Sequence, residues 1–117
     1  MRVAQVAEAS TAPIPVRVLV VDDETGIREL LDRYLSAQGF RVSTAEDATA
    51  ARAILDREPI DLILLDVGLP GEDGLSLTRH VRARSNGAVI LVSGHADPVD
   101  RVVGLEVGAD DYVTKPF

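Results

Sequence analysis

Residues 61–66 read Asp-Leu-Ile-Leu-Leu-Asp, and this stretch decides how the rest of the chain is organised. Four consecutive branched apolar residues between two carboxylates are typical of a short strand buried on both faces. Such strands belong to parallel sheets covered by helices, and these sheets bind ligands beyond the carboxyl ends of their strands. Asp66 stands at that end and is followed by a loop rich in Gly and Pro, residues 67–74. We therefore expect Asp66 to lie at the centre of a functional site.

Composition limits the functions that are open to this chain. Its 117 residues are enough for one domain with a single core. Nineteen acidic against twelve basic residues give a net charge of -7, which disfavours binding to nucleic acid or to a membrane. The chain has no cysteine, so disulfides, thiolate metal sites and cysteine nucleophiles are excluded. No apolar run approaches the roughly 20 residues of a membrane span, and residues 1–15 do not resemble a signal peptide. We expect a cytoplasmic domain preceded by a flexible leader over residues 1–15.

Short apolar runs alternate with helical patterns along the rest of the chain. The expected strands cover residues 16–21, 40–44, 61–66, 88–92 and 111–114. The first expected helix has its apolar residues at helical spacing, namely Ile27, Leu30, Leu31, Tyr34 and Leu35, and Gly39 ends it. Strands and helices that alternate at this spacing predict an α/β fold with a doubly wound parallel sheet.

Three further helices complete the alternation. Asp47 is the expected N-cap of a second helix that runs to about Arg57. A third helix contains Leu77 on its apolar side. Asp97 and Pro98 begin a fourth helix, because an acidic cap followed by proline in the first turn is typical of a helix start.

Polar side chains stand where these strands end. Asp22 and Asp23 follow the first strand, Asp66 ends the third, and Ser93 and Lys115 follow the last two. Because parallel strands share one carboxyl edge, we expect these side chains to converge. Carboxylates that lie close together need a cation between them, and a ligand set of oxygens alone indicates Mg²⁺ rather than zinc. A cation, a hydroxyl and an ammonium around one carboxylate suit a group with anionic oxygens, which is a phosphoryl group.

Each of these residues has a simpler interpretation when it is considered alone. Residues 22–24 could favour the start of the following helix through its dipole, and Asp66 could cap a loop. Ser93 and Lys115 could be ordinary solvated residues. However, Lys115 is the only lysine among the basic residues, and a compact ammonium suits a point contact with phosphate. The pattern as a whole is more specific than any of its parts.

Four blocks of the sequence resemble the signature blocks of bacterial response-regulator receiver domains. They are VLVVDDE at residues 18–24, LLDVGLPGEDG at 64–74, VSG at 92–94 and GADDYVTKPF at 108–117. The resemblance extends over residues 16–117 and implies a CheY-like, flavodoxin-like fold with strand order 2-1-3-4-5. The last block is most similar to receivers linked to winged-helix DNA-binding domains. Because receivers continue with a further helix after this block, we expect residues 16–117 to be a receiver domain that lacks its C-terminal helix.

The resemblance also implies a phosphorylation and metal site. Asp66 would be the phosphoacceptor. Mg²⁺ would be held by the carboxylates of Asp22, Asp23 and Asp66, with Asp22 acting through water, and by the backbone carbonyl of Gly68.

The same resemblance implies the residues that detect the phosphoryl group. Ser93 and Lys115 would bind phosphoryl oxygens. Ser93 and Tyr112 would form the switch, because movement of Ser93 towards the phosphoryl group leaves space into which Tyr112 can turn. The peptide bond between Lys115 and Pro116 would be cis, an isomer accessible chiefly before proline.

The implied function is signal transduction without turnover of a separate substrate. The domain would take a phosphoryl group from a sensor histidine kinase and change conformation. This change would control an output, which is transcription. One alternative is an interaction module of receiver shape that is not phosphorylated. Another is a phosphatase with an aspartyl nucleophile, which is disfavoured because Gly68 stands where such enzymes have a second Asp.

The expected absence of a final helix has a consequence for assembly. That helix would lie beside the first helix, over the strands that begin near Val16 and Asp111. Without it, we expect apolar side chains of those strands and of the first helix to face water. This face would be covered by a second copy of the chain or by the leader folding back.

Overall fold

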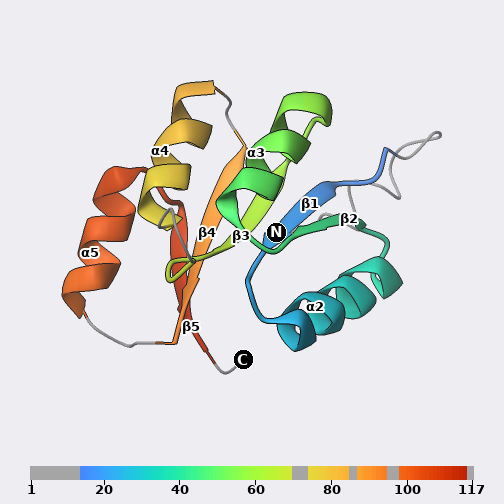
Figure 1. Ribbon diagram of the computed structural model, residues 1–117, viewed down its shortest axis with the longest axis horizontal. Helices are drawn as coiled ribbons and strands as arrows, with labels where there is room; N and C mark the ends of the chain where they lie inside the picture. The colour runs from blue at the N-terminus through green and yellow to red at the C-terminus, as the bar shows by residue number, and fades with distance from the viewer. Residues whose placement is uncertain (1–13, 70–73, 85–86, 95–97, 116–117) are drawn as a thin grey trace.

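The computed structural model describes residues 14–69, 74–84, 87–94 and 98–115. Its elements are β1 (Arg17–Val21), α2 (Thr25–Ala37), β2 (Arg41–Ala45), α3 (Ala48–Arg57), β3 (Leu62–Asp66), α4 (Gly74–Arg84), β4 (Ala88–Ser93), α5 (Pro98–Val107) and β5 (Asp111–Thr114). The strands form one parallel sheet in the order β2-β1-β3-β4-β5 (Figure 1). This order confirms the α/β class and the strand order 2-1-3-4-5. Of the expected leader, only residues 14 and 15 are described.

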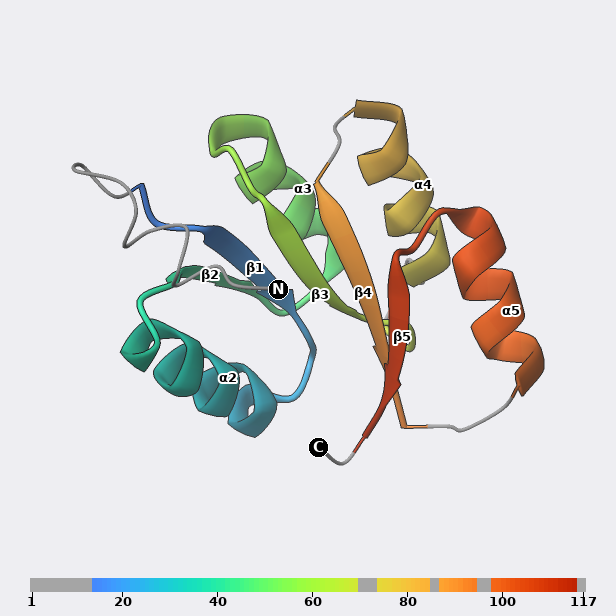
Figure 2. The ribbon, with the colours of Figure 1, turned by 180° about the vertical axis from the view of Figure 1, so that it is seen from behind.

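The main core lies between the sheet and the helices α3 and α4. When the molecule is viewed from behind, β3 and β4 lie in front of these two helices (Figure 2). The sheet contributes every second side chain to this core, because successive residues of a strand point to opposite faces. The fully buried strand residues on this face are Leu19, Val21, Ile63, Leu65, Val89 and Leu91. Ala51, Ile54, Leu77 and Val81 pack against them from the two helices. The core therefore fixes the carboxyl ends of β1, β3 and β4 relative to one another.

Local sequence signals set the helix boundaries. The carboxylate of Asp47 accepts a hydrogen bond of 2.8 Å from the backbone N–H of Ala50, which confirms this residue as the N-cap of α3. Gly39 has φ of 95° just after α2, a conformation that glycine adopts without strain. The helix α5 begins at Pro98 as expected, whereas Asp97 lies outside the described residues.

The opposite face of the sheet is only partly covered. The helix α2 has no fully buried residue, and its Leu30 and Tyr34 are 51% and 61% exposed, which confirms the expected exposure on the first helix. Leu64 and Ile90, neighbours in register on β3 and β4, are only half-buried. The expectation for the first strand is wrong, because Val18 of β1 is fully buried. Since α2 packs over β1 and β2, the uncovered area begins at β3.

Gly74, the first residue of α4, brings this helix directly against the end of β3. A Cβ atom at this position would lie 2.7 Å from the backbone oxygen of Asp66 and 2.8 Å from Cα of Val67. The Gly74 N–H donates to the Val67 oxygen at 3.0 Å, and the Thr78 hydroxyl donates to the Gly74 oxygen at 2.8 Å. The start of α4 and the backbone of Asp66 are therefore held in contact by a residue that has no side chain.

We expect Gly74→Ala to destabilise the fold by about 1–3 kcal/mol, because the added methyl group meets backbone atoms that cannot move independently. Gly26→Ala is the matched control. Gly26 lies in α2, and a Cβ added there would meet no other part of the chain within 4 Å, so this change should be neutral or slightly stabilising. Urea unfolding of both variants provides the measurement. Equal stability of the two variants would show that the contact at Gly74 is not restrictive.

Candidate functional site

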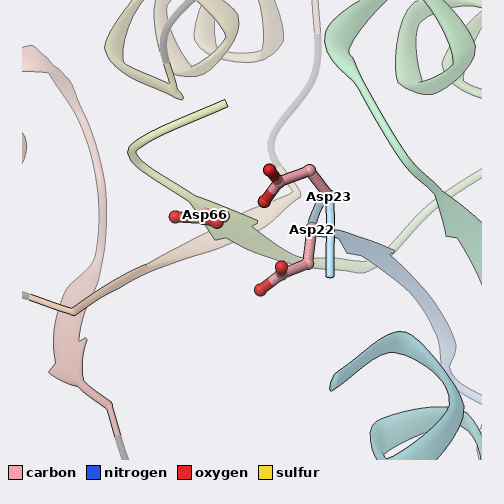
Figure 3. Close-up of side chains that lie close together, drawn as sticks. All are labelled: Asp22, Asp23 and Asp66. Carbon is pink, nitrogen blue, oxygen red and sulfur yellow. The ribbon is translucent and has the colours of Figure 1, made fainter. Parts of the chain in front are cut away.

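Three carboxylates meet at the carboxyl edge of the sheet. Asp22 and Asp23 follow β1 and Asp66 ends β3, and one carboxylate oxygen of each lies within 4.8 Å of the others (Figure 3). The two strands are neighbours, and Val21 pairs with Leu65 immediately before these residues. Asp22 and Asp66 are buried, at 3% and 8% exposure, while Asp23 is exposed. The predicted convergence of the three carboxylates is confirmed.

Lys115 supplies the positive charge of this site. Its Nζ lies 2.8 Å from Oδ2 of Asp22, 3.2 Å from Oε1 of Glu24 and 3.5 Å from Oδ2 of Asp66. The backbone N–H of Lys115 donates to the oxygen of Ser93 at 2.6 Å, which continues the pairing of β4 with β5 past the end of β5. The sheet therefore carries the lysine to the same edge as the carboxylates.

Ser93 and Tyr112, the two expected switch residues, are both buried. Ser93 ends β4 and is 6% exposed. Tyr112 lies in β5 beside Leu91 and belongs to the main core, on the side of the sheet covered by α5. Its phenol oxygen is buried and has no hydrogen-bond partner among the described residues. Tyr112 is thus turned inward in this structure, against Gly104 of α5.

The environment of the site shifts two pKa values. Burial is the main cause that raises the pKa of Asp66, and the charges of Asp22 and Asp23 act in the same direction. A hydrogen bond of 3.0 Å from the N–H of Gly68 and the charge of Lys115 oppose this rise. Burial disfavours the ammonium of Lys115, but its contacts with the carboxylates outweigh burial and hold its pKa above the ordinary value. The surroundings of Asp66 therefore disfavour its negative charge overall.

The oxygen donors of this site fit a hard divalent cation. Both carboxylate oxygens of Asp22 are already engaged, Oδ1 by the N–H of Glu24 at 2.9 Å and Oδ2 by Lys115. The backbone oxygen of Asp22 also accepts a hydrogen bond of 2.7 Å from Arg28. By contrast, the carboxylate of Asp23 is exposed to solvent. A ligand set of carboxylate oxygens with open positions for water is the arrangement that Mg²⁺ prefers.

The roles expected of these residues in phosphorylation, metal binding and switching stay predictions. The N–H of Gly68 bonds Asp66, but the proposed role of the Gly68 carbonyl as a metal ligand is not tested by this contact. Pro116 lies outside the described residues, and so does the expected cis peptide bond that joins it to Lys115.

Sequence reasoning misses two residues of this site. From the sequence, Glu24 is expected only to interact with the helix dipole, yet its carboxylate contacts Lys115. Gly74 is one of several glycines in a Gly-rich loop, yet it packs against the backbone of Asp66. The position of Glu24 directly after two aspartates is the signal that could have identified it. No local signal distinguishes Gly74 from the other loop glycines.

The chain matches the family described as response regulator receiver domain over residues 18–117. It is 53% identical over 106 residues to the transcriptional regulatory protein AruR of Pseudomonas aeruginosa, covering 86% of this chain and 43% of AruR. It is 47% identical over 104 residues to TorR, the TorCAD operon transcriptional regulatory protein of Escherichia coli K12, covering 89% of this chain and 45% of TorR. The chain therefore spans less than half the length of these two relatives.

Solved structures agree with this match. The crystal structure of the receiver domain of TorR has a TM-score of 0.83 and 47% identity, covering 88% of this chain and 86% of that one. A response regulator from Burkholderia pseudomallei was solved with a phosphorylated aspartic acid, a calcium ion and citrate. It has a TM-score of 0.83 and 27% identity, covering 87% of this chain and 61% of that one. This chain belongs to the receiver domains of two-component response regulators. Such domains typically undergo phosphorylation without turnover of a separate substrate.

The helices in the described part of the chain are not membrane spans. None of them is both long enough and apolar enough to cross a bilayer.

We expect Asp66→Asn to make the metal-free protein more stable at pH 7, since it removes a buried charge and its repulsion from Asp22 and Asp23. A carboxyl group whose pKa rises on folding destabilises the fold at pH values above that raised pKa. This cost disappears below the ordinary carboxyl pKa of about 4. The advantage of the variant should therefore shrink as the pH falls towards that value.

Urea unfolding in the presence of a chelator, repeated at several pH values, measures this difference. Glu29→Gln, which removes an exposed charge from α2, serves as the control and should change stability little. An Asp66→Asn variant that is less stable than the parent protein at pH 7 would contradict the assigned environment of Asp66.

Proposed function

We propose that residues 16–117 form a receiver domain in which Asp66 accepts a phosphoryl group from a histidine of a sensor kinase. One observation carries this proposal. The carboxylate of Asp66 is buried, it lies with those of Asp22 and Asp23 in one cluster, and its Oδ2 faces the ammonium of Lys115 at 3.5 Å. This arrangement suits a nucleophile that receives a group with several anionic oxygens.

The proposed transfer is a single displacement at phosphorus. An oxygen of Asp66 forms the new O–P bond while the P–N bond to the kinase imidazole breaks, and the imidazole keeps the electron pair of that bond. Lys115 and the hydroxyl of Ser93 would bind phosphoryl oxygens, and the position of both residues at the sheet edge that carries Asp66 supports this role. Water later hydrolyses the acyl phosphate.

The carboxylate cluster is the proposed binding site of Mg²⁺, the expected cofactor. Asp23 and Asp66 would bind the ion directly, together with the backbone carbonyl of Gly68, and Asp22 would act through water because its own oxygens are engaged. When bound, Mg²⁺ supplies positive charge that stabilises the transferring phosphoryl oxygens. The phosphorylated aspartic acid and calcium ion of the Burkholderia pseudomallei relative support this assignment.

The proposed output is control of transcription through a change of conformation in the cytoplasm. Ser93 and Tyr112 are the proposed switch: Ser93 moves towards the phosphoryl group and leaves space into which Tyr112 can turn. The names of AruR and TorR as transcriptional regulatory proteins support this output. Because the chain has a net charge of -7, we propose that this segment itself contacts neither DNA nor membranes.

The direct test is incubation with acetyl phosphate and Mg²⁺, followed by intact mass spectrometry. We expect one added phosphoryl group per chain, lost in Asp66→Asn and absent when Mg²⁺ is chelated. The control Asp56→Asn, which changes an exposed aspartate on α3, should be phosphorylated like the parent protein. An unmodified parent protein would support a receiver-shaped interaction module instead. Turnover of a phosphoester would support a phosphatase.

We also propose that the partly covered face of the sheet associates with a second copy of the chain. Leu30 and Tyr34 of α2 are exposed, and Leu64 and Ile90 on the same side of the sheet are half-buried. Exposed apolar side chains that gather on one side of a domain commonly mark a contact with another protein. Residues 1–15 folding back over the same face are the alternative cover.

Sedimentation of the unphosphorylated chain separates these possibilities. A dimer that dissociates in Tyr34→Glu is expected if this face is the contact. Arg33→Glu, which changes the neighbouring exposed residue of α2, is the matched control. A stable monomer at high micromolar concentration, unchanged when residues 1–15 are deleted, would contradict both forms of the proposal.

A further inference from the structure

We propose that Glu24 positions Lys115 in the unphosphorylated domain and competes with the phosphoryl group for its ammonium. This inference rests on the proposed phosphorylation of Asp66. The Lys115 ammonium has three N–H donors, and three carboxylates lie within reach, at 2.8 Å, 3.2 Å and 3.5 Å for Asp22, Glu24 and Asp66. Asp22 and Glu24 hold the ammonium through hydrogen bonds, whereas Asp66, the most distant of the three, attracts it as an ion pair. A phosphoryl group on Asp66 that draws the ammonium closer must therefore compete with the contacts to Glu24 and Asp22.

Glu24 is the contact that is easiest to release. The side chain of Asp22 is 4% exposed and makes the shortest of the three contacts, so its loss would leave a buried carboxylate without its partner. Asp66 carries the phosphoryl group itself. The side chain of Glu24 is 62% exposed, and water can replace the lysine around its carboxylate at little cost.

The helix α2 does not use the side chain of Glu24. Glu24 is the N-cap residue of α2, but its side chain makes no capping hydrogen bond. Its N–H instead bonds Oδ1 of Asp22, and its carboxylate extends to Lys115, 91 residues further along the chain. The side chain thus links the loop after β1 to the end of β5 rather than stabilising its own helix.

The contact with Lys115 and the charge of Glu24 have separable consequences. The contact withholds one donor of Lys115 from a phosphoryl group. The negative charge, next to Asp22 and Asp23, attracts a divalent cation. Loss of both should therefore strengthen binding of a phosphoryl analogue and weaken binding of the metal. A variant that merely damages the fold would weaken both.

The test uses Glu24→Gln and measures two affinities by NMR titration of the backbone amides. At saturating Mg²⁺ we expect Glu24→Gln to bind trifluoroberyllate, a tetrahedral phosphoryl analogue, about two- to fivefold more tightly than the parent chain does. This factor corresponds to the energy of an exposed ion pair. Mg²⁺ alone should bind more weakly. Glu24→Asp keeps the charge on a side chain too short to reach Lys115. It should therefore bind the analogue as tightly as Glu24→Gln does while keeping the parent affinity for Mg²⁺.

Glu29→Gln is the matched control, because Glu29 is also an exposed glutamate of this region but lies on α2 itself. It should leave both affinities close to those of the parent chain. The proposal is overturned if Glu24→Gln leaves the affinity for trifluoroberyllate unchanged or weaker, or if Glu29→Gln strengthens it equally. Failure of the parent chain to bind the analogue would instead reject the proposed phosphorylation of Asp66.

Discussion

Three carboxylates with oxygens within 4.8 Å of one another repel strongly, and Lys115 contacts two of them, those of Asp22 and Asp66. Two of these carboxylates, those of Asp22 and Asp66, are also buried, so water screens their charges poorly. One ammonium cannot balance this cluster. A metal ion held by these oxygens would relieve the remaining repulsion, and the cluster is one that could hold such an ion.

The rest of the fold keeps this unfavourable cluster together. The apolar residues of β1 and β3 are packed from one face by α3 and α4, and register pairing between these strands places Asp66 beside the residues that follow Val21. At the end of β3, the contact of Gly74 with the backbone of Asp66 leaves little room for the aspartate to move away. Burial of apolar side chains thus supplies the stability that the carboxylates reduce.

The two faces of the sheet have different roles in this arrangement. The face under α3 and α4 forms the main core and also receives Tyr112, which connects the core to the strand that leads to Lys115. The other face is packed by α2 over β1 and β2 and is more open from β3 onward. Structural stability and assembly can therefore depend on separate surfaces, while the site at the strand ends lies between them.

The sequence was sufficient for the fold and for most of the site because both depend on simple periodic patterns. Runs such as residues 61–66 identify buried parallel strands, and parallel strands bring the residues at their ends to one edge whatever the details of packing. Other features depend on distances that a sequence does not contain. The burial of Val18 depends on where α2 lies, the restriction at Gly74 on how closely α4 approaches β3, and the contact of Glu24 on the reach of one side chain.

The carboxylate cluster is central to the proposed function because it must act as a cation site. Calorimetric titration of the unphosphorylated chain with Mg²⁺ tests this role without any phosphoryl donor. We expect one ion to bind per chain with a dissociation constant of about millimolar or somewhat tighter, as suits an open site that keeps several waters. Asp23→Ala should remove most of this binding, because Asp23 is the exposed carboxylate of the cluster. An unchanged affinity in Asp23→Ala, or no binding by the parent chain, would contradict the assignment.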